Sequence, residues 1–171
     1  MKLIICKTFS ISVLFISLAY AEEKKYFKDA KYFEWGIYSN KKKSLCYAIT
    51  KPRKSEGKYD IRGKVNLLVG RNTRKKNENF VAVDFGYPFK KNTIVDISID
   101  NKYFFKLKTF DETAWTRESD IKQLGDLVIK EMIKGNKLVA MGVSKRGTIT
   151  KDIYSLRGFS KAFKKIKQMC E

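Results

Sequence analysis

The sequence contains no histidine, only two prolines and only three cysteines in 171 residues. The lack of histidine excludes Ser-His-Asp and Cys-His nucleophile pairs and nearly all zinc sites. A P-loop, a G-x-G-x-x-G segment and a G-x-S-x-G nucleophile elbow are also absent. We therefore predict that the protein is not an enzyme and has no catalytic residue, metal or cofactor.

Acidic residues are few as well: 18 Asp and Glu stand against 37 Lys and Arg, which gives a net charge of +19. Such a charge attracts polyanions, for example lipopolysaccharide phosphates, anionic lipid head groups and acidic glycans. The densest basic loop holds the residues that we predict as anion contacts, namely Arg71, Arg74, Lys75 and Lys76. The alternative is diffuse surface charge, because 30 of the 37 basic residues are lysines, whereas phosphate sites favour arginine.

Long apolar runs are missing except near the N-terminus. A positive start at Lys2 is followed by an almost wholly apolar stretch at 9–18, and Ala19 and Ala21 then form an A-x-A cleavage site. This pattern is typical of a secretory signal peptide, which we predict over residues 1–21. A membrane anchor is the alternative, but about 20 apolar residues are needed to span a bilayer, and this run is shorter.

Cleavage after Ala21 would leave residues 22–171 as a single domain with no transmembrane segment and a net charge of +17. It would also remove Cys6, so that Cys46 and Cys170 are the cysteines left in an oxidising compartment. Two cysteines allow one intramolecular disulfide, which we predict between the C-terminal helix and an early strand. Two buried free thiols are the alternative.

Most of the remaining sequence consists of short segments that alternate apolar and polar residues. The clearest pair is 93–99 and 103–107, because Asp100 and Asn101 between them favour a tight hairpin turn. About seven or eight such segments, separated by turns, predict an antiparallel β-sandwich or barrel.

Two segments have the apolar period of a helix, near 119–134 and near 158–169. In the first, Ser119 or Asp120 can cap the start, and Gly135 follows the end. Gly125 inside this helix costs about 1 kcal/mol relative to alanine. The apolar residues of the first segment are Ile121, Leu124, Leu127, Val128, Met132 and Ile133, and those of the second are Phe159, Ala162, Phe163 and Ile166.

Catalysis by carboxylates alone is the one enzymatic alternative. An envelope glycan hydrolase could use Asp96, Asp100, Asp111 or Glu112, provided that two carboxyl groups lie about 5–10 Å apart across a cleft. Polarity on an exposed strand face explains the same residues. A structural or chaperone-like periplasmic subunit is a further alternative.

Several short motifs in the sequence are similar to those of a known family. They are Trp35, Cys46-Tyr47, Gly86-Tyr87-Pro88-Phe89, Ile97-Ser98-Ile99-Asp100, Phe105, Ala114-Trp115, Gly142, Ser144, Gly147-Thr148, Asp152, Tyr154-Ser155-Leu156, Gly158-Phe159 and Cys170. With them the chain resembles the invasion-associated locus B family from about Phe33 to Cys170. The most specific stretch lies between Gly147 and Phe159.

The resemblance implies an exported, mainly β protein with an immunoglobulin-like antiparallel β-sandwich, a helix inserted late and another at the end. It places the chain in the periplasm or at the outer membrane of α-proteobacteria, and the family has no assigned catalytic residues. Members often carry a further cysteine at a place that corresponds to the region near Ser39, so Cys46–Cys170 is the pairing left here.

Together these observations predict an interaction protein in the periplasm, at the outer membrane or secreted. The expected partners are anionic cell-envelope components or an envelope or host protein, and not nucleic acid. The larger aromatic residues are predicted to build a core between two sheets rather than a carbohydrate-stacking platform. They are Trp35, Tyr47, Phe85, Tyr87, Phe89, Phe104, Phe105 and Trp115.

Overall fold

A computed structural model describes residues 26–75, 77–116 and 123–171 of the chain. The predicted signal peptide, Lys76 and the predicted start of the first helix at 119–122 lie outside the described residues. Within these residues the strands are β1 (Tyr26–Tyr32), β2 (Trp35–Asn40), β3 (Leu45–Thr50), β4 (Lys54–Gly57), β5 (Asn66–Asn72), β6 (Glu78–Asp84), β7 (Ile94–Ile99), β8 (Tyr103–Phe110), β9 (Thr113–Trp115), β10 (Lys137–Val143) and β11 (Ile149–Ser155). The helices are the short 3-10 helix η1 (Thr73–Lys75), α1 (Leu124–Lys134) and α2 (Phe159–Met169).

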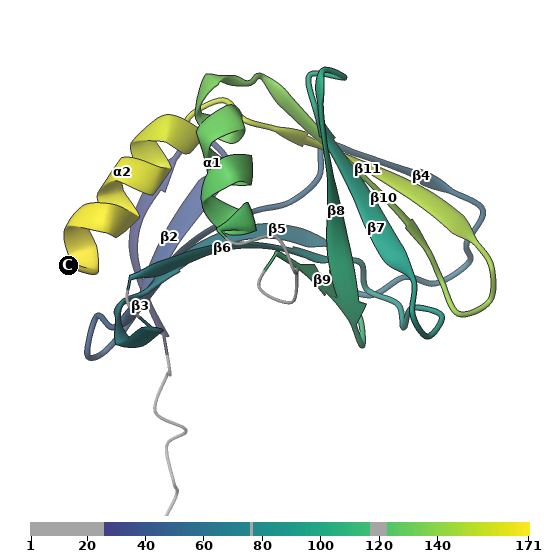
Figure 1. Ribbon diagram of the computed structural model, residues 1–171, viewed down its shortest axis with the longest axis horizontal. Helices are drawn as coiled ribbons and strands as arrows, with labels where there is room; N and C mark the ends of the chain where they lie inside the picture. Colours follow the sequence, from purple (N-terminus) through teal and green to yellow (C-terminus); the bar gives the residue numbers. More distant parts are fainter. Residues whose placement is uncertain (1–25, 76, 117–122) are drawn as a thin grey trace, which may run out of the picture.

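The eleven described strands form one antiparallel sheet in the order β1-β2-β3-β5-β6-β9-β8-β7-β10-β11-β4. Figure 1 shows that the sheet bends between β9 and β8, and that α1 and α2 lie along the half that contains β2, β3, β5 and β6. The predicted class, a mainly β sandwich-like fold with one mid-chain and one C-terminal helix, is therefore confirmed. The two layers of the sandwich are the two halves of one continuous sheet. The number of described strands is higher than the predicted seven or eight, because it includes short strands such as β4 and β9.

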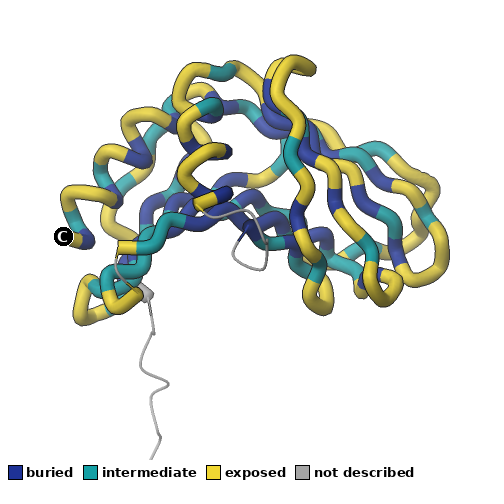
Figure 2. The backbone as a smooth tube through the Cα atoms, viewed as in Figure 1, coloured by how far each residue is buried: buried dark blue, intermediate teal, exposed yellow. Residues whose placement is uncertain are grey.

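Alternation along the strands separates an inner from an outer face. In β3, Cys46 and Ala48 are buried and Tyr47 between them is half-buried, and Val95, Ile97 and Ile99 of β7 are buried in the same way. Figure 2 shows buried positions alternating with exposed ones along the strands around β7 and β10. The hairpin predicted between β7 and β8 is present.

The turn of this hairpin needs two residues with positive φ. Asp100 and Asn101 supply it, with φ of 50° and 55°, as the tight turns of twisted hairpins require. The carboxylate of Asp100 also accepts hydrogen bonds from the backbone N–H groups of Asn136 and Lys137, at 3.0 and 2.9 Å. The turn therefore also holds the start of β10.

Helix α2 closes the inner face of the first half of the sheet. Phe159, Ala162, Phe163 and Ile166 are its buried residues, as the helical period predicts. The ring of Phe159 packs on that of Trp35 with centroids 4.9 Å apart, and both side chains are fully buried. The tryptophan of the family motif is thus a core residue.

Helix α1 packs against β6 through its glycine. A Cβ atom on Gly125 would collide with the backbone carbonyl oxygen of Asn79, so the absence of a side chain allows close packing. Ile129 is buried, whereas Leu127 and Ile133, predicted for the apolar face, are 46% and 42% exposed. In the described part of the chain, neither α1 nor α2 has the length and apolar character needed to cross a bilayer.

Part of the predicted aromatic core is confirmed, whereas Tyr47 and Trp115 lie outside the core, on the strand faces opposite to the buried residues of β3 and β9. Trp35 and Phe85 are fully buried and Phe89 is nearly so. The prediction for Phe104 is wrong, because this side chain lies on the outer face of β8 and is 72% exposed. Its strand alternates, and the neighbours Phe105 and Leu107 take the inward positions instead.

Candidate functional site

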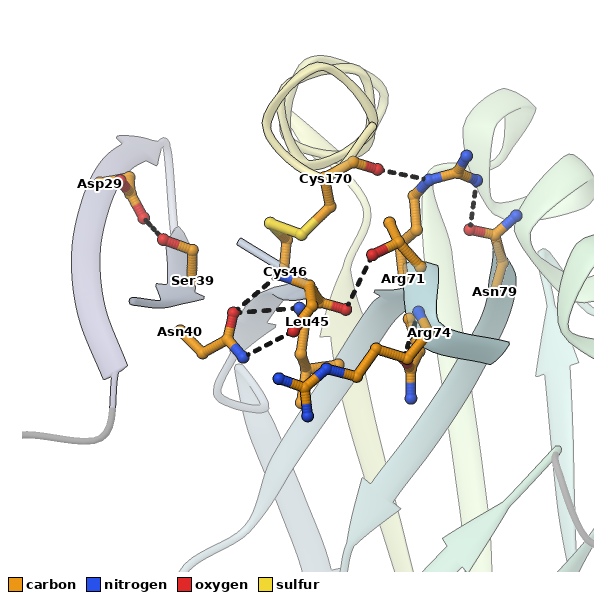
Figure 3. The surroundings of a disulfide bond; sticks show 12 residues. Asp29, Ser39, Asn40, Leu45, Cys46, Arg71, Arg74, Asn79 and Cys170 are labelled. Atoms are coloured by element: carbon orange, nitrogen blue, oxygen red, sulfur yellow. Dashed lines mark hydrogen bonds between the residues drawn. A yellow bond between two sulfur atoms is a disulfide. The ribbon is translucent and has the colours of Figure 1, made fainter. Parts of the chain in front are cut away.

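The C-terminal end of α2 is fixed to the sheet by a disulfide. Cys46 on β3 and Cys170 are joined with their Cα atoms 5.9 Å apart, and both residues are fully buried. Figure 3 shows the bond beneath the end of the helix, with Arg71 beside it. The predicted pairing is present.

The basic loop predicted to contact anions lies next to this disulfide. Arg71 is half-buried and its Nε donates a hydrogen bond to the backbone carbonyl of Cys170 at 2.9 Å. Arg74 and Lys75 are exposed in η1, and Lys76 lies outside the described residues. The guanidinium of Arg71 therefore serves a contact within the protein, while an anion contact at Arg74 and Lys75 stays a prediction.

A second arginine, Arg62, is held in a buried ion pair. It lies in the irregular segment between β4 and β5, and its Nη1 and Nη2 donate hydrogen bonds to the two carboxylate oxygens of Asp152 on β11, at 2.8 and 2.6 Å. The side chains of Arg62 and Asp152 are 4% and 0% exposed. Ser55 Oγ on β4 donates to the same carboxylate at 2.6 Å, and Arg62 Nε donates to the carbonyl of Phe85 at 2.6 Å. The pair thus joins four separate segments of the chain.

Aromatic rings surround the guanidinium of Arg62. Its Cζ lies 5.1 Å from the ring centroid of Tyr87, 5.4 Å from that of Tyr59 and 5.7 Å from that of Phe85. Burial opposes the charged form of Arg62, but the hydrogen bonds and the charge of Asp152 outweigh it and raise the pKa of the guanidinium. Burial also raises the pKa of Tyr87, whose hydroxyl shares a 2.7 Å hydrogen bond with Thr150. The arginine therefore stays charged and fixed in place.

A cleft of about 1060 Å³ has Tyr59 and Tyr87 among its lining residues. Arg62 contacts both rings from behind and does not itself line the cleft, so the Arg62–Asp152 pair forms its buried base, and we name it the Arg62 cleft. Three exposed cations line it, namely Lys58, Lys145 and Arg146, whereas Asp60 is the one carboxylate among the described residues of its lining. None of the three cations forms an ion pair with another described residue. The cleft therefore offers a positive surface above a rigid base.

Two loops cross at the side of the cleft through a pair of glycines. The N–H of Gly63 donates to the carbonyl of Gly86 at 2.8 Å, and Gly86 has a φ of +65°. A Cβ atom on Gly86 would lie 2.5 Å from the carbonyl carbon of Gly63. Only glycine fits this crossing, which brings the segments of Arg62 and Tyr87 together.

Comparison with known families identifies one that matches most of the chain. A family model described as invasion associated locus B (IalB) protein matches residues 37–167, more than half of the chain. The chain belongs to the invasion associated locus B family. The resemblance inferred from the sequence motifs is thereby confirmed, and the family is one of invasion-associated bacterial proteins.

The fold agrees with a solved IalB structure. The crystal structure of invasion associated protein B from Bartonella henselae superposes with a TM-score of 0.58, over 82% of this chain and 96% of that chain. The two sequences are 13% identical, so the likeness concerns the fold alone. No curated protein matches the chain.

Several motifs that carry the IalB resemblance meet at the Arg62 cleft. The segment 86–88 forms one wall, and Ser144 and Thr148 line the cleft too, while Asp152 is buried behind the lining in its ion pair with Arg62. The backbone N–H of Lys145 donates to the carbonyl of Pro88 at 2.8 Å and so joins the first two groups. The sequence shows each of these motifs but does not predict that they lie together, because their proximity depends on contacts between segments far apart in the chain.

Arg62 itself is not predicted as a functional residue from the sequence. The available signal was weak: an arginine in a lysine-rich chain, three residues after Tyr59 and immediately before Gly63. Its partner Asp152 is 90 positions away, and no local pattern connects the two. Burial of both side chains, rather than spacing, identifies the pair.

The carboxylates considered for a glycan hydrolase do not line the cleft. Asp96 is exposed on the outer face of β7 and pairs with Lys106 at 3.1 Å, and Asp100 accepts backbone hydrogen bonds at the β10 start. Asp111 and Glu112 are exposed in the turn between β8 and β9. Of the described acids, Asp60 lines the cleft and Asp152 lies in an ion pair at its base.

Proposed function

We propose that this IalB-family chain is an exported, non-enzymatic envelope protein that binds an anionic envelope component in the Arg62 cleft. The observation that carries the proposal is the charge of the cleft at the place where the family motifs converge: among the described residues, its lining holds three cations without an ion-pair partner and one carboxylate. A phosphate or carboxylate group of the partner would contact Lys58, Lys145 and Arg146.

The rigid base supports binding rather than catalysis. Arg62 and Asp152 are buried against each other, with further hydrogen bonds from Arg62 to Phe85 and from Ser55 to Asp152. Because both groups are buried and hydrogen-bonded to each other, we assign the pair the role of holding the loops that present the rim. Preformed loops reduce the entropy that a ligand must remove on binding.

Export is part of the proposal. Residues 1–21 have the charge, apolar run and A-x-A site of a signal peptide, and residues 22–171 would be the mature domain. The Cys46–Cys170 disulfide is compatible with an oxidising compartment such as the periplasm. The charge of +17 on residues 22–171 favours the anions of the cell envelope as partners.

The experiment compares binding of the exported protein to lipopolysaccharide, to peptidoglycan, and to phosphatidylglycerol and phosphatidylcholine vesicles, at low and high salt. We expect affinity for at least one anionic surface that falls with salt, since exposed charges are screened beyond about 8–10 Å at 0.1–0.15 M. The triple variant Lys58→Ala/Lys145→Ala/Arg146→Ala should bind about tenfold more weakly or worse.

The matched control removes the same charge from a different face. Lys161, Lys164 and Lys167 are exposed on α2, and the triple alanine variant there should keep the binding. An equal loss in both triple variants would assign binding to net charge, and binding that is indifferent to salt would contradict the proposal. Either result would reject the cleft as the site.

A further inference from the structure

A second groove, of about 660 Å³, lies on the outer face of the first half of the sheet. Along β2, Trp35 and Ile37 are buried toward α2, so Gly36 and Tyr38 point to the opposite side. On β3, Ile49 joins them as the cross-strand partner of Gly36. We name this the Tyr38 groove, and it shares no lining residue with the Arg62 cleft.

The groove is lined by one aromatic ring that is fixed by its neighbours. Tyr38 stacks on its cross-strand partner Tyr47, with centroids 5.4 Å apart and ring planes 13° apart. The ring extends over Gly36, where a Cβ atom would lie 3.0 Å from Tyr38 Cε2. A larger residue at position 36 would displace the ring, so the glycine and Tyr47 together keep it in place.

Basic side chains lie around this ring. Lys28 and Lys31 come from β1, and Lys51 follows β3; all three are exposed, and they form no ion pair with another described residue. Arg53 also lines the groove, but it is paired with Glu34 at 3.1 Å. The pair cancels, and the three lysines leave the groove with a net positive charge.

From this arrangement we infer that the Tyr38 groove binds an acidic saccharide, with a sugar ring on Tyr38 and its carboxylate or phosphate on the lysines. The slightly positive C–H face of a pyranose matches the negative face of an aromatic ring. The positive charge of the three lysines selects a charged sugar over a neutral one.

The geometry favours a saccharide over two other anions. A single-stranded nucleic acid needs successive aromatic platforms along a basic track, whereas Tyr38 is the one aromatic ring among the described residues that line the groove. An anionic membrane would be gripped by exposed apolar side chains, but Ile49 and Pro52 are half-buried here. The sheet face thus fits a small charged ring.

The test measures binding of the exported protein to trigalacturonic acid by calorimetry, with the trimethyl ester as the uncharged counterpart. We expect the acid to bind at least about tenfold more tightly than the ester. Tyr38→Ala and Lys28→Gln/Lys31→Gln should each weaken binding of the acid about fivefold or more. Tyr38→Phe should bind as the unchanged protein does, because the ring and not the hydroxyl provides the platform.

The controls keep this inference separate from the proposed function. The Lys58→Ala/Lys145→Ala/Arg146→Ala variant should retain trigalacturonate binding, even if it loses the envelope ligand. If Tyr38→Ala fails to fold, the lysine variant and the comparison of the acid with its methyl ester still decide the outcome. Equal affinity for the methyl ester, or tighter binding of an oligothymidylate or an oligoglutamate of the same charge, would overturn the inference.

Discussion

Arg71 and Cys46 lie directly opposite each other on β5 and β3, and both hold Cys170. Cys46 is joined to Cys170 by the disulfide, and Arg71 Nε donates a 2.9 Å hydrogen bond to its backbone carbonyl. One covalent bond and one polar contact, from neighbouring side chains, thus fix the end of α2 to the sheet. The two contacts can be removed separately.

The first prediction concerns the disulfide. Replacing both cysteines, as Cys46→Ala/Cys170→Ala, should lower the free energy of unfolding by about 5 kcal/mol, because the bond closes a loop with a sequence separation of 124. Urea unfolding of the oxidised protein and the double variant measures the difference. A loss of less than about 1 kcal/mol would show that the bond adds little to the packing of α2.

The second prediction concerns Arg71. Arg71→Met should cost about 1–2 kcal/mol, because it leaves the buried carbonyl of Cys170 without the Arg71 donor. In the disulfide-free background the cost should shrink, since the end of α2 is then less ordered, and a double-mutant cycle measures this coupling. Binding to anionic vesicles should be unchanged. Lost binding with unchanged stability would instead support the anion contact predicted from the sequence.

The sequence predicted those elements whose signals are local. The β7–β8 hairpin follows from Asp100 and Asn101, whose side chains tolerate the required positive φ. Helix α2 follows from apolar residues at steps of three and four. The Cys46–Cys170 bond follows from the cysteine count once the signal peptide is set aside.

The remaining features depend on contacts far apart in the sequence. Alternation in β8 separates Phe104 from Phe105, but it does not say which face the rest of the chain covers. The Arg62 cleft combines the segments around Arg62, Tyr87 and Asp152, which are brought together by the Gly63–Gly86 loop crossing and by the ion pair between Arg62 and Asp152. Local sequence patterns do not indicate which distant segments contact each other.

The third prediction concerns the buried ion pair. Arg62→Ala or Asp152→Asn should each lower the free energy of unfolding by about 3–5 kcal/mol, because each leaves a buried charged or polar partner uncompensated. Replacing both, as Arg62→Met/Asp152→Leu, should cost clearly less than the sum of the single changes. Urea unfolding of the three variants provides the comparison, and additive losses would show that the two side chains act independently.

The fourth prediction concerns Gly125 in α1. Helix propensity alone predicts that Gly125→Ala stabilises the protein by about 1 kcal/mol. The contact with the backbone of Asn79 reverses the sign, because a methyl group there forces α1 away from β6. We expect a loss of about 1–3 kcal/mol in thermal or urea unfolding. Lys130→Ala, an exposed change on the same helix, should stay within about 0.5 kcal/mol of the unchanged protein.

The fifth prediction concerns the hydroxyl of Tyr154. The side chain is fully buried, and its oxygen has no hydrogen-bond partner among the described residues. Removing an unsatisfied buried hydroxyl relieves a desolvation cost, so Tyr154→Phe should leave stability at neutral pH unchanged or raise it by about 1 kcal/mol. A loss greater than about 1 kcal/mol would show that the hydroxyl has a bonded partner, such as an ordered water.

Tyr154 should also make the free energy of unfolding decrease at alkaline pH. Burial, reinforced by the negative charge of Asp152, raises the pKa of Tyr154 above the unfolded value of about 10. The folded state therefore keeps a proton that the unfolded state loses, so this contribution is complete below about pH 10 and falls as the pH rises further. Unfolding free energies measured from about pH 7 to 11 should decline less steeply for Tyr154→Phe than for Tyr103→Phe, whose tyrosine is 38% exposed on β8. Equal slopes would mean that Tyr154 does not cause the alkaline loss.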